Sequence, residues 1–287
     1  MKITERCTQQ GDETLFICDY SPPKSGGPET WEPAKHLNAE YICVAYNPGK
    51  AVRVNSAALA YTIKQETGRD AIFNLSPRDM NKLALQSLLL GAQLLGLNNV
   101  LVLQGDPFTP KQLANVKDVS DFTSTGLMQA IAKMNEGLDY KGLKLDSPTS
   151  FCIGATMDLG RGIEHEASLA HRKVQAGAQF FLTQPVFSPA TIHQILETYE
   201  TTAGYALTQP IFWGVQIFVQ GGVIFSSVPE RIRTDLEKGR DGVEIALETL
   251  AAFREAGINR FYLIPPILKG GGRDYEAAQK MLLAVRA

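Results

Sequence analysis

Long hydrophobic runs are missing from the 287-residue sequence. One of the longest apolar stretches, residues 87–97 (SLLLGAQLLGL), falls far short of the roughly 20 residues that a membrane-spanning helix needs. The first residues, MKITERCTQQGDE, are polar and hold nothing like the apolar core of a secretory signal peptide. We therefore expect a cytoplasmic protein with no membrane partner.

Cysteine, histidine and net charge are also scarce. The 4 cysteines lie far apart without a C-x-x-C pair, and three of them sit in apolar runs, which predicts reduced and mostly buried thiols. The 4 histidines form no H-E-x-x-H or similar cluster, so no metal site is expected. With 28 Lys and Arg against 30 Asp and Glu, the chain has no broad cationic field that would attract nucleic acid.

Several catalytic signatures are absent as well. The sequence has no G-x-S-x-G nucleophile elbow, no G-x-x-x-x-G-K-[ST] phosphate loop and no Cys/His pair with recognisable spacing. A glycine run at residues 270–273 (GGGR) follows the last apolar run. Its amides would suit an anion, but a flexible connector is the favoured interpretation.

What the sequence does contain is an alternation of short apolar runs with helical patterns. Runs that are apolar on both faces are typical of a parallel sheet covered by helices. Eight runs with helical returns predict a (β/α)8 TIM barrel of the α/β class, with a doubly wound open sheet as the competing interpretation. The predicted strands are residues 15–19, 41–45, 71–75, 100–103, 151–155, 180–183, 212–217 and 260–264.

The domain organisation is expected to be simple. No low-complexity tract, internal repeat or linker divides the chain, so we expect one barrel domain over residues 1–287. The connection after the fourth predicted strand is longer than a bare helical return and contains the turn DPFTP at residues 106–110. We therefore expect an insertion at about residues 107–149.

Polar residues follow the predicted strands, at the end of a barrel where ligands bind. Asp19 ends the first strand, and a carboxylate there is either exposed at the mouth or buried with a partner, which makes it a candidate proton donor. Asp106 before Pro107 equally suits a turn cap, and Gln184 equally suits a strand end. The mixture favours a neutral heteroaromatic ligand over a metal. The remaining residues of this kind are Asn74, Gln104, Thr156 and Gln216.

Four longer motifs carry a resemblance to a known family. They are residues 19–24 (DYSPPK), 102–107 (VLQGDP), 171–178 (HRKVQAGA) and 181–187 (FLTQPVF). Through them the sequence resembles the methylenetetrahydrofolate reductase family over essentially the whole chain. The stretches NPG at residues 47–49 and MNEG at residues 134–137 are similar to the branch whose reductase module is fused to, or works beside, methyltransferases.

The resemblance implies a flavin-bearing barrel of one-carbon metabolism. NADH or NADPH would reduce FAD, and FAD would exchange hydride with the one-carbon unit of tetrahydrofolate, interconverting 5,10-methylenetetrahydrofolate and 5-methyltetrahydrofolate. It further implies a homo-oligomer and a methyltransferase or electron-transfer partner. The electron donor stays open, because no ribose-reading motif of a Rossmann unit is present.

Four residues acquire substrate or catalytic roles from the resemblance. Asp19 stands where the family usually has a glutamate that donates a proton, and Asp106 corresponds to the aspartate beside flavin and pterin. Gln184 corresponds to the glutamine that touches the pterin, and Phe218 lies in a segment, residues 216–229, that normally holds substrate or nicotinamide. The segment looks shorter here than in the family.

The cofactor residues follow from the same comparison of motifs. Arg172 and Lys173 resemble the basic pair at the flavin diphosphate. Gln104 stands where arginine is frequent and Asn74 where histidine is frequent, so we predict weaker flavin binding. The positions that line the flavin are Ala45, Asn74, Gln104, Gly105, Asp106 and Thr156. Two alternatives remain: a flavin-free barrel that transfers hydride directly from nicotinamide to pterin, and a catalytically silent folate-binding subunit.

Overall fold

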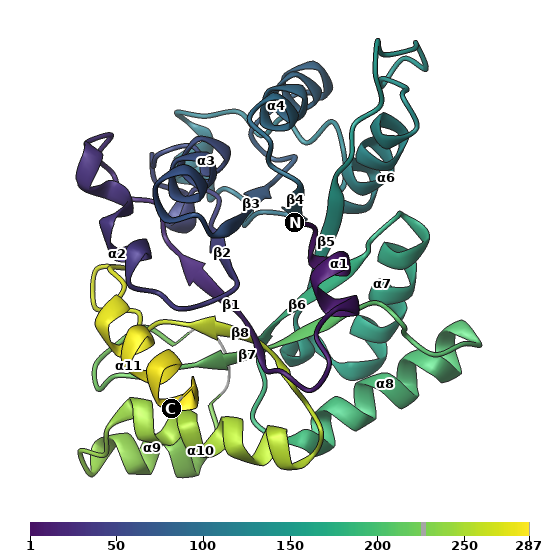
Figure 1. Ribbon diagram of the computed structural model, residues 1–287. Helices are drawn as coiled ribbons and strands as arrows, with labels where there is room; N and C mark the ends of the chain where they lie inside the picture. Colours follow the sequence, from purple (N-terminus) through teal and green to yellow (C-terminus); the bar gives the residue numbers. More distant parts are fainter. Residues whose placement is uncertain (225–227, 287) are drawn as a thin grey trace.

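The computed structural model describes residues 1–224 and 228–286. Eight parallel strands form a closed barrel in chain order, and Figure 1 looks along it. Leu15 of the first strand pairs with Arg260 of the last, so the sheet has no open edge and the predicted barrel is confirmed. The strands are β1 (Leu15–Tyr20), β2 (Tyr41–Val44), β3 (Asp70–Leu75), β4 (Asn99–Val102), β5 (Cys152–Met157), β6 (Phe180–Pro185), β7 (Ile211–Gln216) and β8 (Arg260–Ile264).

Helices surround the strands, with local signals at their ends (Figure 1). The Asn55 side chain accepts hydrogen bonds from the amides of Ala57 and Ala58 at the start of α3, and Gly68 ends that helix with φ +69°. The helices are α1 (Ile3–Thr8), α2 (Glu32–Lys35), α3 (Ser56–Thr67), α4 (Lys82–Leu94), α5 (Pro110–Leu113), α6 (Ser124–Asn135), α7 (Ile163–Gln175), α8 (Pro189–Ala203), α9 (Glu230–Glu237), α10 (Gly242–Glu255) and α11 (Tyr275–Arg286). Short 3-10 turns are η1 (Pro28–Trp31), η2 (Pro48–Lys50) and η3 (Leu159–Arg161).

The apolar core has two main layers and a small separate cluster around Phe218. The larger layer lies between the strands and the helices, and the smaller layer fills the barrel interior with alternate residues of the strands. Gly154 makes room in the interior, because a side chain there would overlap the ring of Phe180. The interior layer includes Leu15, Ile17, Tyr41, Cys43, Ile72, Leu101, Cys152, Phe180, Leu182 and Phe212.

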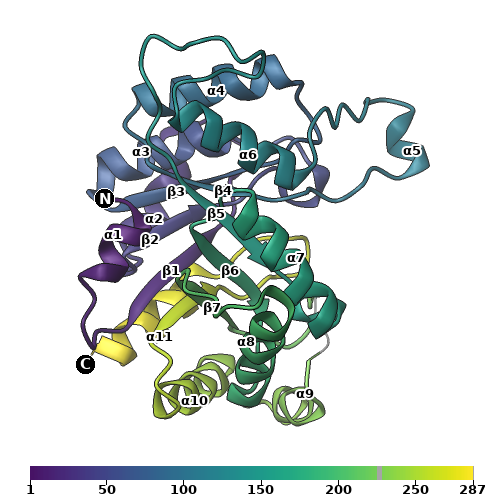
Figure 2. The same cartoon turned by 90° about the vertical axis from the view of Figure 1, so that its right-hand side faces the viewer.

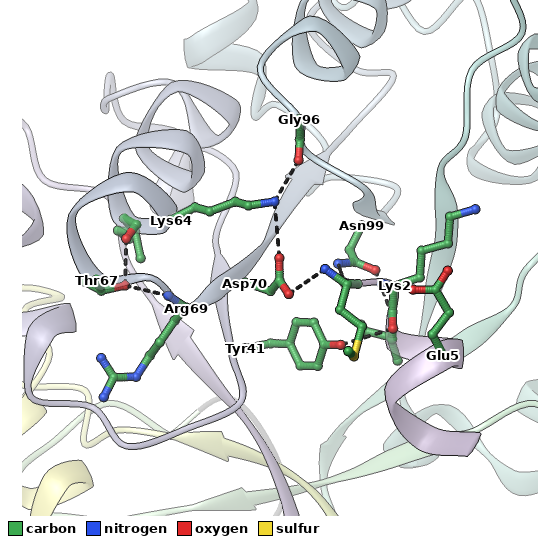
Figure 3. A network of polar contacts seen from close by, with 12 residues as sticks. Lys2, Glu5, Tyr41, Lys64, Thr67, Arg69, Asp70, Gly96 and Asn99 are labelled. Atoms are coloured by element: carbon green, nitrogen blue, oxygen red, sulfur yellow. Dashed lines mark hydrogen bonds and ion pairs between the residues drawn. The ribbon is translucent and has the colours of Figure 1, made fainter. Parts of the chain in front are cut away.

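The amino end of the barrel is closed by α1 and the residues before it. Ile3 is fully buried and belongs to the interior layer, and its amide donates to Asn99 Oδ1 at 3.0 Å. The amino group of Met1 and the Lys64 ammonium both pair with Asp70, at 2.6 and 3.2 Å. Figure 3 shows the polar network at this end, with Lys64, Asp70 and Asn99 labelled. This end is therefore filled by the chain itself.

The segment between β4 and β5 carries two helices. Figure 2 shows α5 projecting on the side opposite α1, and α6 packs against β4 and β5 as the return helix. An antiparallel bridge between Leu138 and Lys144 shapes the remainder of the connection. Because α6 takes the ordinary place of a barrel helix, the extra length lies on either side of it.

Candidate functional site

A buried carboxylate lies at the carboxyl end of the barrel. Asp19, near the end of β1, is 5% exposed. The Tyr262 hydroxyl of the neighbouring strand β8 donates to Asp19 Oδ1 at 2.8 Å, and Arg273 Nε donates to Asp19 Oδ2 at 3.2 Å. Of the two arrangements that the sequence allowed, the structure has the buried carboxylate with partners.

Two further side chains extend this arrangement across β2 and β3. Cys43 pairs with Asp19 in the sheet register, and its thiol donates to Asn74 Oδ1 at 3.2 Å. Burial and the Asp19 charge raise the pKa of the Cys43 thiol and of the Tyr262 hydroxyl well above their usual ranges. Both groups therefore stay protonated donors. We call Asp19, Cys43, Asn74, Tyr262 and Arg273 the Asp19 cluster.

The loop after β4 is held by its backbone. The Ser76 hydroxyl donates to the Gln104 carbonyl at 3.0 Å, and Gly105 adopts φ +77° where a Cβ would lie 2.5 Å from that hydroxyl. Arg78 Nη1 donates to the Asp106 carbonyl at 2.9 Å. The Asp106 side chain is exposed, whereas the Gln104 side chain accepts a bond from the Ser124 amide at the start of α6. Asp106 therefore presents its carboxylate from a fixed backbone.

A cavity of about 440 Å³ lies beside the loops that follow β5 and β6. Its position at the carboxyl ends of barrel strands is where ligands bind in this architecture. Gln184, in β6 next to these loops, is exposed, and Thr156 in β5 is partly exposed. The lining residues are Asp158, Leu159, Gly160, Pro185, Val186, Phe187, Ser188, Thr191, Val228 and Pro229.

The structure separates the basic pair that the sequence placed together. Arg172 is exposed on α7, whereas Lys173 is 6% exposed and its ammonium donates to the Thr156 carbonyl at 2.5 Å. Burial lowers the pKa of Lys173, and the nearby buried carboxylate of Glu166 opposes that shift. The Glu166 carboxylate also accepts a bond from the Asp158 amide at 3.1 Å. Lys173 therefore holds the end of β5 from a buried position on α7.

Two other predicted ligand residues occupy less open positions. Phe218 is buried and stacks on Phe187, with 6.1 Å between the ring centroids. Phe187 lines the cavity, and the substrate-binding role of Phe218 stays a prediction. Ala45 is partly exposed at the end of β2. The segment 216–229 includes residues 225–227, which lie outside the described residues, and its expected shortening stays a prediction.

Sequence reasoning missed Tyr262 and Arg273. Tyr262 lies in the middle of a predicted strand, where alternation places it on the interior face with Arg260 and Ile264, but its hydroxyl gave no separate signal. Arg273 follows the glycine run that was interpreted as a connector. Its pairing with Asp19 joins positions 254 residues apart, which a single sequence does not reveal.

The described part of the chain contains no group of three or more His, Cys, Asp or Glu placed to hold a metal ion. Within residues 1–224 and 228–286, no helix has both the length and the apolar character required to cross a membrane. The four cysteines are free thiols, three of them buried.

Comparisons with known proteins agree on the fold. The family model described as methylenetetrahydrofolate reductase matches residues 3–264. A solved structure titled as an uncharacterized protein from Clostridium thermocellum that binds two copies of 5-methyl-5,6,7,8-tetrahydrofolic acid is similar with a TM-score of 0.68, at 13% identity, covering 99% of each chain. A 2,3-dimethylmalate lyase of the PEP mutase/isocitrate lyase superfamily is similar with a TM-score of 0.52, at 12% identity, covering 98% of this chain and 81% of that one. No curated protein sequence matches the chain.

Proposed function

Because the chain belongs to the methylenetetrahydrofolate reductase family, we propose that it is an FAD-dependent oxidoreductase that interconverts 5,10-methylenetetrahydrofolate and 5-methyltetrahydrofolate. The observation that carries this proposal is the Asp19 cluster, a partnered carboxylate at the ligand-binding end of a barrel of this family. The Clostridium thermocellum protein shares the fold, and its 5-methyltetrahydrofolate ligands support a folate for this chain.

The mouth of the barrel fits a flavin at its ring end. The exposed Asp106 carboxylate offers a hydrogen-bond acceptor to the flavin ring, and Gly105 has no side chain to obstruct it. The diphosphate end would be held by Arg172, which is exposed on α7. A bound flavin would supply reversible hydride transfer at its N5 atom.

Residues of the chain are proposed to bind the folate and to transfer the proton of its N10 atom. Opening the imidazolidine ring of 5,10-methylenetetrahydrofolate needs a proton on N10, and closing it removes that proton. Asp19 is the group assigned to this proton, with Tyr262 bonded to the same carboxylate. Asp106 and Gln184 are assigned to the pterin edge, because both are exposed beside the strands that end at the mouth.

One alternative is a flavin-free reductase in which NADH or NADPH passes hydride directly to the pterin, and the burial of Lys173 bears on both cofactors, because FAD and NAD(P)H each carry a diphosphate. A diphosphate is normally neutralised by several cations, and here the lysine of the expected basic pair is committed to a carbonyl inside the protein. The catalytically silent folate-binding subunit would need a methyltransferase or electron-transfer partner instead. We place the enzyme in the cytoplasm as a homo-oligomer by family analogy.

An absorbance spectrum of the purified protein tests the proposal, followed by anaerobic addition of 5-methyltetrahydrofolate. We expect a flavin spectrum that bleaches on addition, which identifies cofactor and substrate class together. In a second titration, Arg172→Gln should lower FAD affinity, whereas the control Arg254→Gln, on exposed α10 surface, should not. A colourless protein that rejects added FAD but oxidises 5-methyltetrahydrofolate with added NAD(P)⁺ would establish the flavin-free alternative. Failure to bind 5-methyltetrahydrofolate would contradict the proposal as a whole.

A further inference from the structure

The glycine run after β8 folds into a tight hairpin. The Leu268 amide donates to the Gly272 carbonyl at 2.9 Å, and the Gly271 amide donates to the Leu268 carbonyl at 2.9 Å. Gly270 and Gly271 have φ values of +97° and +89°, which side chains rarely adopt. Because these bonds close the turn, the run is an ordered hairpin, which replaces the connector interpretation.

Contacts on both sides fix the hairpin. Ile267 pairs with Arg273 as an antiparallel bridge, and the Ile267 carbonyl accepts a bond from the Val223 amide at 2.8 Å, in the segment after β7. The Asp274 amide donates to the Pro266 carbonyl at 3.0 Å. The backbone on each side of Arg273 is therefore held in place before its side chain makes any contact.

Two alternate residues of this segment reach the end of β1. Arg273 Nε lies 3.2 Å from Asp19 Oδ2, and the two side chains are 10% and 7% exposed. The Tyr275 hydroxyl accepts a bond from the Ser21 amide at 2.9 Å, and its ring stacks on Tyr20 with 4.7 Å between the centroids. The segment after β8 thus clamps β1 at Asp19 and at the residues that follow it.

We propose that Arg273 is a positioning residue that holds Asp19 as an oriented carboxylate, so that the resting site presents a base to the substrate. The inference rests on the proposed function. A carboxylate has about four acceptor positions, and Tyr262 and Arg273 occupy two of them. The other lone pairs are left to accept an N–H group of the ligand, and the planar guanidinium fixes the carboxylate plane that aims them.

A base at this position suits the oxidation of 5-methyltetrahydrofolate. A hydride leaves the methyl carbon for an oxidised flavin or nicotinamide, N10 bonds to that carbon, and the N10 proton passes to the Asp19 carboxylate. The products are 5,10-methylenetetrahydrofolate with an uncharged methylene bridge, the reduced acceptor and the protonated Asp19 side chain. Reduction of 5,10-methylenetetrahydrofolate uses the same steps in reverse and requires Asp19 to take up a proton first. The ion pair with Arg273 therefore orients the carboxylate that receives the N10 proton in the oxidative direction.

The test compares Arg273→Gln, Arg273→Lys, Asp19→Asn and the Asp19→Asn/Arg273→Gln double variant in two anaerobic single-turnover reactions. The first follows flavin reduction by 5-methyltetrahydrofolate, or NAD(P)⁺ reduction if the protein binds no flavin. The second follows flavin reduction by NAD(P)H, or, without flavin, calorimetric binding of NAD(P)H. We expect Arg273→Gln to slow the first by about tenfold or more and to leave the second unchanged. Arg273→Lys should recover part of the rate, and Arg254→Gln is the matched control.

The double variant separates positioning from general support. Because Arg273 acts through Asp19, Arg273→Gln should cause little further loss in the Asp19→Asn background. Equal losses in both reactions, or multiplicative losses in the double variant, would overturn the role of Arg273 while leaving the proposed function intact. If Arg273→Gln fails to fold, the lysine variant decides, and a wild-type rate for it would overturn the proposal. A wild-type protein that neither binds nor oxidises 5-methyltetrahydrofolate would overturn the proposed function itself.

Discussion

The two ends of the barrel each hold a carboxylate with two partners, but their surroundings differ. At the amino end, Asp70 pairs with the amino group of Met1 and with Lys64, and the adjacent Asn99 amide bonds in both directions to the backbone of residues 1–3 (Figure 3). At the carboxyl end, the Asp19 carboxylate is held by the side chains of Tyr262 and Arg273 and, among the described residues, by no backbone group of another segment. The pairs at the amino end therefore attach the first residues of the chain to the barrel, whereas those at the carboxyl end orient the carboxylate to which the proposed function assigns a proton.

Replacing Asp19 should give the largest effect on the reaction rate, and the matching replacement at the amino end should give none. We expect Asp19→Asn to slow the oxidation of 5-methyltetrahydrofolate by about 10²- to 10⁴-fold, because the proton of N10 loses its acceptor. Rapid-mixing absorbance of the flavin measures this, with NAD(P)H-driven reduction as the internal reference. The matched variant Asp70→Asn should leave both rates unchanged. Parallel loss of both reactions in Asp19→Asn would show a structural role.

The opposite result is expected for Ile3, which fills the amino end of the interior layer. Ile3→Ala should lower the free energy of unfolding by about 2–5 kcal/mol, because a fully buried side chain leaves a cavity. Urea denaturation measures the loss, and the rate per folded molecule should stay unchanged. Leu94→Ala is the control, since Leu94 is 87% exposed at the end of α4. A reduced catalytic rate in folded Ile3→Ala would show that the two ends are coupled.

The barrel was predictable because its signals are local and repeated. Each strand was predicted by a short apolar run, and the count of eight runs favoured a closed barrel over an open sheet. For the mouth of the barrel, the sequence predicted which strand ends contribute polar residues. Asp19, Asn74 and Gln184 were selected only because they lie at or near the ends of predicted strands. Motif resemblance added the family, which the match over residues 3–264 confirms.

The contacts within the mouth were not predictable, because they depend on side-chain direction and long-range pairing. Arg172 and Lys173 are adjacent in sequence, yet helix geometry sends one outward and the other behind β5. Similarly, the run of glycines before Arg273 allowed several loop conformations. Only the folded hairpin shows that the arginine returns to β1, far away in the sequence.

A smaller change is expected from the ion pairs at the amino end. Asp70→Asn should cost about 1 kcal/mol or less of stability, since its side chain is 24% exposed and solvent weakens both pairs. The difference between wild type and variant should shrink as salt is added. Urea denaturation at low and high sodium chloride checks this. A salt-independent loss would assign the effect to hydrogen bonding instead of charge.

Lys173 gives the smallest effect, and its sign is set by pH. Because burial lowers the pKa of Lys173 in the folded state below its ordinary value of 10.5, the unfolded chain binds more protons in the window between these values. Stability contributed by this residue must therefore rise with pH through that window. In Lys173→Met this rise is absent, so the unfolding free energy of the wild type minus that of the variant should increase from neutral pH toward 10. Urea denaturation of both proteins at each pH isolates the contribution of Lys173, because the tyrosines and cysteines titrate in both and cancel in the difference. A difference that is flat with pH would mean that the ammonium is solvated, and would return Lys173 to the open end of the barrel as a candidate phosphate ligand. A falling difference would mean that pairing with Glu166 outweighs burial.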